Sequence, residues 1–311
     1  MEIILNILLP VFGIATMGYA AVRLGWFSES AEAGVSTFIF NFAVPFMMFR
    51  TIARTDLPDR IPFDLFGTYY LPALIVFGIG LVMGRRVFGR DWSGAILTGM
   101  GGAFSNTVLL GLPIVVLAYG EEGALPFFLI LSVHGLVMFT GTTILLEVAK
   151  SSTHSASALI GEVVSGLVRN PILIGIFFGI VTNLTGIGIA EPLDRIAQTM
   201  QGAVLPGALF VLGASLSRYG IAGRLTQSAF LVLMKLAVFP ALVFVFGTYL
   251  FAMDPHWTAV AVITAAQPVG VMVYLFASRY GTTTALATTT IFLTTVLSVA
   301  TNGLILWFFG V

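Results

Sequence analysis

Two apolar segments of the sequence are interrupted by short polar runs whose side chains could bind a ligand. The first run is Ser105-Asn106-Thr107, and the second contains Gln267 and Pro268, with Gln267 lying 161 residues after Asn106. A helix that breaks inside a membrane leaves backbone N–H and C=O groups without partners, and such breaks are tolerated where they line a cavity. Matching breaks in two halves of a chain are typical of a transporter's binding site. We therefore predict that these residues bind substrate.

The chemistry that the two breaks offer is anion binding by neutral groups. A half-helix that begins at Asn106 would point its free N–H groups and its positive dipole end toward the break, and such an end can hold an anion without a buried Lys or Arg. Pro268 in the first turn of the second half-helix would lose no hydrogen bond. Gly111, Pro113 and Gly270 are expected to shape the crossover structurally. Simple proline kinks with glycine-mediated packing are the alternative.

Three more polar residues lie inside apolar segments. Asn41 comes one turn before Pro45 and either faces the substrate pathway or hydrogen-bonds a carbonyl freed by that proline. His134 lies near the middle of its segment, where an ionisable group is a functional hypothesis by default. It would bind substrate, take a proton, or stay neutral and bond to a neighbouring helix. Lys235 could attract an anion, but we expect it to snorkel or to pair within the bundle.

The composition places nearly the whole chain in a membrane. Of its 311 residues, 58% are hydrophobic and 9% are charged, with a mean hydropathy of +1.03, whereas a soluble domain has roughly 25% charged residues. The chain has no cysteine, which excludes disulfides and thiolate chemistry. Its net charge of zero gives no sign of a nucleic-acid partner. No catalytic arrangement is recognisable in the apolar segments, so we expect neither an enzyme nor a metal or other cofactor.

Ten apolar segments organise the chain, each close to the roughly 20 residues that cross a bilayer. Landmarks recur 161 residues apart, such as Pro10 with Pro171 and Pro45 with Pro206. Two halves of five segments each, 1–150 and 151–311, must insert in opposite orientations. The predicted fold class is therefore an all-α polytopic membrane protein made of two inverted five-helix repeats, with segments four and nine broken. The segments are expected at about 3–22, 33–50, 63–84, 93–118, 124–147, 168–189, 196–217, 225–250, 257–278 and 284–309.

Positive charge predicts the orientation of the chain in the membrane. Odd-numbered connections carry nine Lys and Arg residues and even-numbered ones carry four, which favours cytoplasmic odd connections and both termini outside the cytoplasm. The sizeable linker lies at the midpoint, from Lys150 to Ser157, and the amphipathic stretch 158–168 after it could lie in the interface. We expect a plasma membrane location, the inner membrane in a bacterium.

Several runs of the sequence resemble the auxin efflux carrier family, which includes bacterial dicarboxylate permeases and the plant PIN auxin exporters. Residues 105–113 are similar to the family's Pro-Asn-Thr-Leu-Val-x-Gly-x-Pro crossover motif, with Ser105 in place of the first proline. Residues 169–171, 206–216 and 265–270 resemble the start of span six, span seven and the span-nine crossover. The likeness covers nearly the full chain.

The resemblance implies a scaffold of spans 1, 2, 6 and 7, a mobile transport subdomain of spans 3–5 and 8–10, and a homodimer formed through the scaffold. The predicted function is secondary transport of small organic anions by elevator-type alternating access, with H⁺, Na⁺ or no coupling ion. A sodium-coupled symporter of the bile-acid type is one alternative, although Gln267 is neutral and no acid lies nearby. A membrane receptor or scaffold that does not transport is the other.

Overall fold

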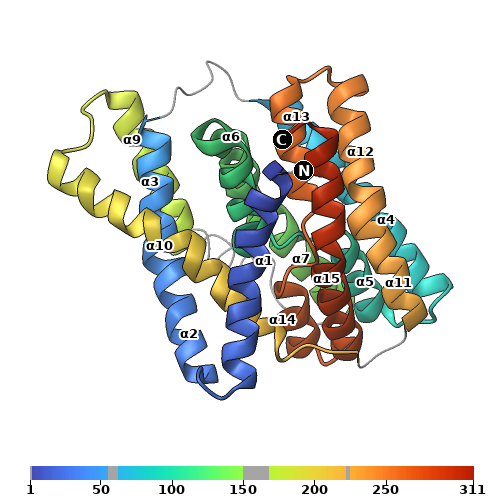
Figure 1. Cartoon of the computed structure of the whole chain (residues 1–311). Coiled ribbons are helices and arrows are strands. Elements are labelled where there is room, and N and C mark those ends of the chain that lie inside the picture. Colours follow the sequence, from blue (N-terminus) through green and yellow to red (C-terminus); the bar gives the residue numbers. More distant parts are fainter. Residues whose placement is uncertain (1, 55–61, 150–167, 222–224) are drawn as a thin grey trace.

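The computed structural model describes residues 2–54, 62–149, 168–221 and 225–311, which are helical almost throughout (Figure 1). Within these residues no strand forms beyond one isolated β-bridge. The predicted midpoint linker and nearly all of the amphipathic stretch after it lie outside them. The α-helices are α1 (Glu2–Arg23), α2 (Glu29–Phe38), α3 (Val44–Arg54), α4 (Phe63–Arg86), α5 (Trp92–Ala103), α6 (Leu112–Gly135), α7 (Gly141–Ala149), α9 (Pro171–Thr185), α10 (Glu191–Leu216), α11 (Leu225–Leu233), α12 (Phe239–Val245), α13 (Pro255–Ala265), α14 (Met272–Arg279) and α15 (Thr284–Phe308). The π-helical turns are η1 (Ile39–Ala43), η2 (Thr107–Gly111), η3 (Leu136–Thr140), η4 (Met234–Val238) and η5 (Phe246–Leu250).

Among the described residues, six continuous helices are long and apolar enough to cross a membrane. Two of the other predicted spans are represented by shorter apolar helices, Ile7–Arg23 and Pro171–Thr185. The predicted spans 93–118 and 257–278 are divided, because α5 ends at Ala103 and α13 ends at Ala265. The all-helical membrane class is thus confirmed. The six helices are Glu29–Arg54, Phe63–Arg86, Glu122–Ala149, Glu191–Leu216, Leu225–Leu250 and Thr284–Phe308.

Three prolines inside these segments each follow a π-helical turn: Pro45 comes after η1, Pro113 after η2 and Pro240 after η4. A proline ring inside an α-helix clashes with the carbonyl four residues earlier, and a wider turn relieves that clash. The residue before each proline donates its N–H to the carbonyl five residues back, in the pairs Val44–Ile39, Leu112–Thr107 and Phe239–Met234. Asn41 and Lys235 lie on two of these widened turns.

The core is divided between two hydrophobic clusters. The first is built mainly from α1, α3, α9 and α10 with η2 and α6, and the second mainly from α4, α5, α12, α13, α14 and α15; α6, α13 and α15 contribute residues to both. Figure 1 shows α3, α9 and α10 on one side of the molecule and α4, α11 and α12 on the other, with α6 and α15 between them.

Glycines bring the helices of the first cluster into close contact. A Cβ atom on Gly179 would lie 3.0 Å from the Phe49 carbonyl oxygen, and one on Gly18 would collide with the Phe210 carbonyl oxygen. Gly18 and Gly179 are 161 residues apart, as are Phe49 and Phe210. The α1–α10 and α3–α9 contacts therefore join residues that share one spacing of 161, and small residues permit this approach in a membrane, where apolar burial drives little helix association.

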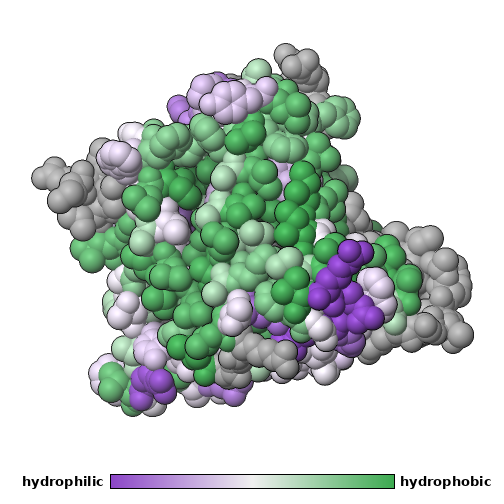
Figure 2. All heavy atoms as spheres, turned by 90° about the vertical axis from the view of Figure 1, so that its right-hand side faces the viewer, coloured by the Kyte–Doolittle hydropathy of each residue, from purple (hydrophilic) through white to green (hydrophobic). Residues whose placement is uncertain are grey.

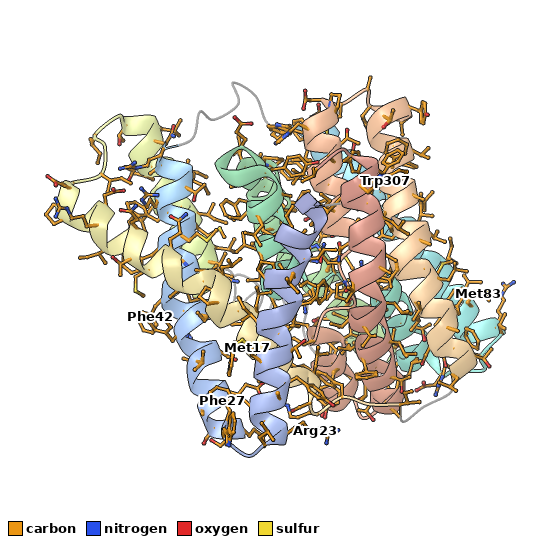
Figure 3. All side chains as sticks on the ribbon, viewed as in Figure 1. Met17, Arg23, Phe27, Phe42, Met83 and Trp307 are labelled. Atoms are coloured by element: carbon orange, nitrogen blue, oxygen red, sulfur yellow. The ribbon has the colours of Figure 1, made fainter. Side chains whose placement is uncertain are left out.

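The outer surface is apolar over much of its height. Figure 2 shows hydrophobic residues across the middle of one face, with hydrophilic ones toward its upper and lower ends. Phe42, Met17 and Trp307 lie on the outside of the helices (Figure 3) and are 52%, 63% and 69% exposed. Apolar side chains exposed in such numbers are expected of a surface that contacts lipid.

Candidate functional site

Two unwound segments, residues 104–106 and 266–271, pair with each other in the interior. The Asn106 N–H donates to the Pro268 carbonyl at 2.8 Å, and the Gly270 N–H donates to the Phe104 carbonyl at 3.1 Å, which makes an antiparallel bridge between Ser105 and Val269. Backbone groups in a membrane interior must find partners within the protein. The two segments supply partners to each other at the place where each helix stops.

Glycines at the contact leave room for the opposite segment. A Cβ atom on Gly270 would collide with the Phe104 ring, and one on Gly111 would lie 3.2 Å from Gln267 Cγ. Both glycines, which were predicted to shape the crossover, lie at this contact. Pro113 lies in the first turn of α6, directly after η2, and helps to line a cavity described below.

Asn106 presents a donor that has no partner among the described residues. Its side chain is 6% exposed and its Nδ2 atom makes no hydrogen bond. Leaving a buried polar group unpaired costs about 1–3 kcal/mol, so such a group needs an explanation, and a ligand is one. Thr107 begins η2 beside it, is 4% exposed, and its N–H donates to the Ser105 carbonyl at 2.9 Å.

Gln267 is fully buried and is held mainly by protein groups. Its Nε2 atom donates to the Ile263 carbonyl at 2.7 Å and to Asn302 Oδ1 at 3.1 Å. Its Oε1 atom and Asn302 Nδ2 have no partner among the described residues. Asn302, on α15, was not predicted; an amide inside an apolar span was the signal that could have indicated it.

Lys235 reaches both unwound segments. It is fully buried, and its Nζ atom donates to Ser105 Oγ at 2.8 Å and to the Ala265 carbonyl. The same ammonium lies 4.8 Å from the centroid of the Phe239 ring. Of the two expectations for Lys235, snorkelling or pairing within the bundle, the structure shows the second: the amine points into the bundle, where these oxygens hold it.

The Ser105 hydroxyl is saturated by this arrangement. Besides the Lys235 bond, it accepts from the Tyr69 hydroxyl at 3.3 Å and donates to the Ala265 carbonyl at 3.4 Å. A hydroxyl offers one donor and two lone pairs, so the three contacts use its full capacity. Ser105 therefore supports the site through other groups and has little capacity left for a ligand.

His134 lies behind the first unwound segment, among aromatic rings. It is 2% exposed, stacks on Phe104 with ring centroids 4.8 Å apart, and meets the edges of Tyr69 at 5.7 Å. Neither ring nitrogen has a hydrogen-bond partner among the described residues. The structure thus brings His134 next to the break.

Asn41 is placed apart from the buried cluster. It lies in η1, which packs mainly against α2, α3, α9 and α10, and its side chain is exposed, as is that of Phe42 beside it (Figure 3). Of the seven predicted binding residues, the structure gathers Ser105, Asn106 and the rest around the breaks, and Asn41 lies elsewhere.

A cavity of about 270 Å³ separates α3, α6 and α10 next to the crossover. Gln201 is its polar member, and the Gln201 Oε1 atom accepts a hydrogen bond from Arg50 Nη1 at 3.2 Å. The cavity is large enough for a small organic molecule, and Pro113 connects its wall to the half-helix that starts at Thr107. It is lined by Met47, Leu112, Pro113, Val116, Gln201, Gly202, Val204, Leu205 and Pro206.

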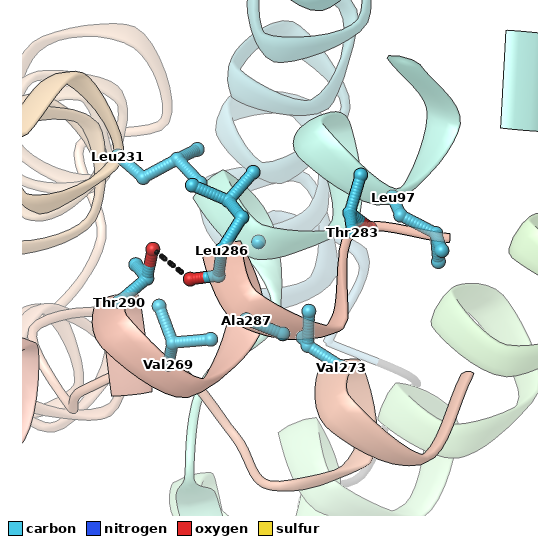
Figure 4. A pocket seen from close by; sticks show the side chains of 9 residues that line it. Leu97, Leu231, Val269, Val273, Thr283, Leu286, Ala287 and Thr290 are labelled. Atoms are coloured by element: carbon cyan, nitrogen blue, oxygen red, sulfur yellow. Dashed lines mark hydrogen bonds between the residues drawn. The ribbon is translucent and has the colours of Figure 1, made fainter. Parts of the chain in front are cut away.

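A second gap, of about 10 Å³, lies under the other break (Figure 4). Val269, Val273 and Leu286 make its walls largely apolar, and the Thr290 hydroxyl bonds to the Leu286 carbonyl at 2.8 Å. A volume of this size holds about one water molecule. It is a packing gap and is too small for a substrate.

The site holds no carboxylate: no acidic side chain of the described residues hydrogen-bonds or ion-pairs with Lys235, Ser105, Asn106 or Gln267. The described part of the chain also has no group of three or more His, Cys, Asp or Glu residues that could hold a metal ion. Beside the unpaired Gln267 Oε1 acceptor, the breaks offer the unpaired Asn106 Nδ2 donor and the Lys235 amine, which suit an anion.

Comparison with known proteins places this geometry in context. Residues 3–306 match the family model described as "Membrane transport protein". The chain is 28% identical, over 302 residues, to a protein of Rhizobium meliloti (strain 1021) called "Putative malonate transporter", covering 96% of this chain and 93% of that one. It is 24% identical to "Auxin efflux carrier component 8" of Arabidopsis thaliana, covering 87% of this chain and 88% of that protein. It is also 29% identical to "Lysosomal cholesterol signaling protein" of Mus musculus, of which the match spans 29%.

Proposed function

The chain belongs to this family of membrane transport proteins, the family of the auxin efflux carriers that its sequence resembles, and from that premise we propose that it is a secondary transporter of small organic anions. The observation that carries the proposal is the buried pair of unwound segments. Together they offer the unpaired Asn106 amide and the Lys235 ammonium, with no acidic partner among the described residues. An anion is the ligand that this set of groups stabilises.

Two half-helices begin at the site, at Thr107 and at Met272. The helix dipole makes each of these ends positive, while the Thr107 N–H bonds the Ser105 carbonyl and the Val273 and Tyr274 N–H groups bond the Gly270 and Val271 carbonyls. Two such ends suit a molecule with two carboxylates close together. The name of the Rhizobium relative fits this chemistry, and we therefore propose malonate or a dicarboxylate of similar size as the substrate.

Alternating access would proceed by an elevator movement of one body against the other. The grouping of the helices supports this: the proposed scaffold helices α1, α3, α9 and α10 pack together in the first hydrophobic cluster, and the second cluster comes almost wholly from the proposed transport subdomain, whose α6 packs against the scaffold. The cavity of about 270 Å³ lies between α6, which belongs to the proposed transport subdomain, and α3 and α10 of the proposed scaffold. A substrate held there would be enclosed between a fixed and a moving wall.

The proposed architecture is two inverted five-helix repeats, 1–150 and 151–311. It is supported by the corresponding contacts of Gly18 with Phe210 and of Gly179 with Phe49, and by the two breaks. We further propose a homodimer formed through the scaffold, and a plasma membrane protein with both termini outside the cytoplasm. Accessibility of a tag at either terminus in intact cells tests the orientation.

The test of the substrate is counterflow in proteoliposomes. Vesicles loaded with unlabelled malonate should accumulate external ¹⁴C-malonate. In a panel of mono- and dicarboxylates, the dicarboxylates closest to malonate in size should compete best with this uptake. Protein-free vesicles are the control. Binding without counterflow for every acid in the panel would favour the receptor alternative, and dependence of uptake on a sodium gradient would favour the symporter of the bile-acid type.

A further inference from the structure

The ammonium group of Lys235 lies where the two unwound segments meet. Its Nζ atom donates to the hydroxyl of Ser105, in the first segment, and to the carbonyl of Ala265, the last residue of α13. Its side chain comes from η4, so a third element is tied to both breaks by one amine. Nothing else among the described residues bridges the segments with a charge.

The oxygens around this amine are of the kind that hold small cations. The C-terminal end of a half-helix carries a partial negative charge, and unwound carbonyls and half-helix C-termini coordinate sodium ions in other transporters. Here one such carbonyl, that of Ala265, and a hydroxyl are occupied by a covalently attached ammonium. The Phe239 ring covers a third side of it at 4.8 Å.

The amine of Lys235 has no acidic partner among the described residues. The residue is fully buried, and no acidic side chain of the described residues forms an ion pair with it. A buried charge without a partner is expensive, so an anion that reaches the break would stabilise the protonated amine. The Phe239 ring beside the amine in turn meets the Tyr69 ring, with centroids 5.4 Å apart.

We propose that Lys235 is an internal cation that takes the place of a coupling ion, so that anion binding is independent of sodium. The inference rests on the proposed function, since it supplies the counter-charge for the same anion. Lys235 is a positioning and specificity-determining residue: it fixes Ser105 and the end of α13 and selects for negative charge.

The test is equilibrium binding of ¹⁴C-malonate to the purified full-length protein by scintillation proximity, in sodium chloride and in choline chloride of equal ionic strength. The wild-type Kd should agree between the two salts within about 2-fold. Lys235→Gln keeps a donor for both oxygens and removes the charge, and should raise the Kd by about 30-fold or more. Lys235→Arg keeps the charge and should stay within about 5-fold of wild type.

Arg90→Gln is the matched control for loss of one positive charge. Arg90 bonds Gln227 Oε1 at 2.9 and 2.6 Å, away from the break, and its loss should leave the malonate Kd within about 2-fold. Thermal melting of each variant verifies that it folds. If Lys235→Gln does not fold, Lys235→Met is used to remove the charge instead.

The two ways of failing are distinguishable. Wild-type binding that needs sodium, or wild-type affinity in a folded Lys235→Gln or Lys235→Met variant, would overturn the internal cation and leave the anion transporter in place. Absence of binding for all carboxylates by wild type in both salts would overturn the proposed function itself.

Discussion

The two unwound segments occupy corresponding positions in the sequence but are held in different ways. In the first, residues 104–106, the Asn106 amide has no partner among the described residues. In the second, residues 266–271, the Gln267 amide bonds Asn302 and the Val269 N–H bonds Thr294 Oγ1 at 3.1 Å, so α15 holds the segment. The first segment can thus present a donor to a ligand, while the second is fixed by α15 and supports the first through the backbone bridge.

Of the substitutions that probe this difference, Asn106→Ala should weaken malonate binding most. It removes the unpaired Nδ2 donor and no hydrogen bond of its side chain within the described protein. Losing one hydrogen bond to a charged ligand is worth about 1.5–3 kcal/mol, so we expect the malonate Kd to rise about 10- to 100-fold. The melting temperature should stay near that of wild type. Unchanged affinity in the scintillation assay would show that the segment does not present the ligand.

Gln267→Ala should mainly lower stability. It leaves the Ile263 carbonyl and Asn302 Oδ1 without their donor, which we expect to cost about 1–3 kcal/mol of folding free energy. The malonate Kd should rise less than in Asn106→Ala. Paired thermal melting and binding measurements test this, and a variant with native melting but lost binding would make the two segments equivalent.

Ser105→Ala should have a smaller effect, because it removes one of two oxygens that hold the Lys235 ammonium and leaves the Ala265 carbonyl. We expect a rise in Kd of about 3- to 10-fold. Ser105→Pro should be similar, since the bridge uses the N–H groups of Asn106 and Gly270 and does not use that of Ser105. Failure of Ser105→Pro to fold, with Ser105→Ala intact, would contradict this description of the bridge.

Asn41→Ala should have the smallest effect. Its side chain is exposed on η1, away from the paired segments, and we expect the malonate Kd to stay within about 2-fold. A loss of malonate affinity comparable to that of Asn106→Ala would place Asn41 on the substrate pathway, as the sequence alone had suggested. The proposed scaffold would then contribute a polar contact to the substrate.

Much of the arrangement could be anticipated from the sequence. Apolar length predicts where helices run, and the polar runs at 105–107 and 266–268 predict where two of them stop. Proline positions indicated distortion near Asn41 and Asn106, which the π-helical turns explain. These are local properties, which is why spacing along the chain sufficed.

The direction in which buried polar side chains point could not be predicted. Lys235 has a long, flexible chain that could reach the membrane surface, and only the packing of η4 against both breaks decides that it reaches Ser105. Asn302 was overlooked for the same reason, since its role depends on Gln267 lying opposite it on another helix. The two breaks differ in how their side-chain amides are bonded, and this difference likewise arises from the residues that lie next to them in space.

The most direct test of the account is charge movement in proteoliposomes on a solid-supported membrane after a malonate jump, with wild type and Asn106→Ala compared at equal protein density. The account predicts a saturable current in wild type, of similar size with and without a sodium gradient, and its loss in the folded variant. A current that persists in Asn106→Ala with unchanged half-saturation would contradict the claim that the first unwound segment holds the transported anion.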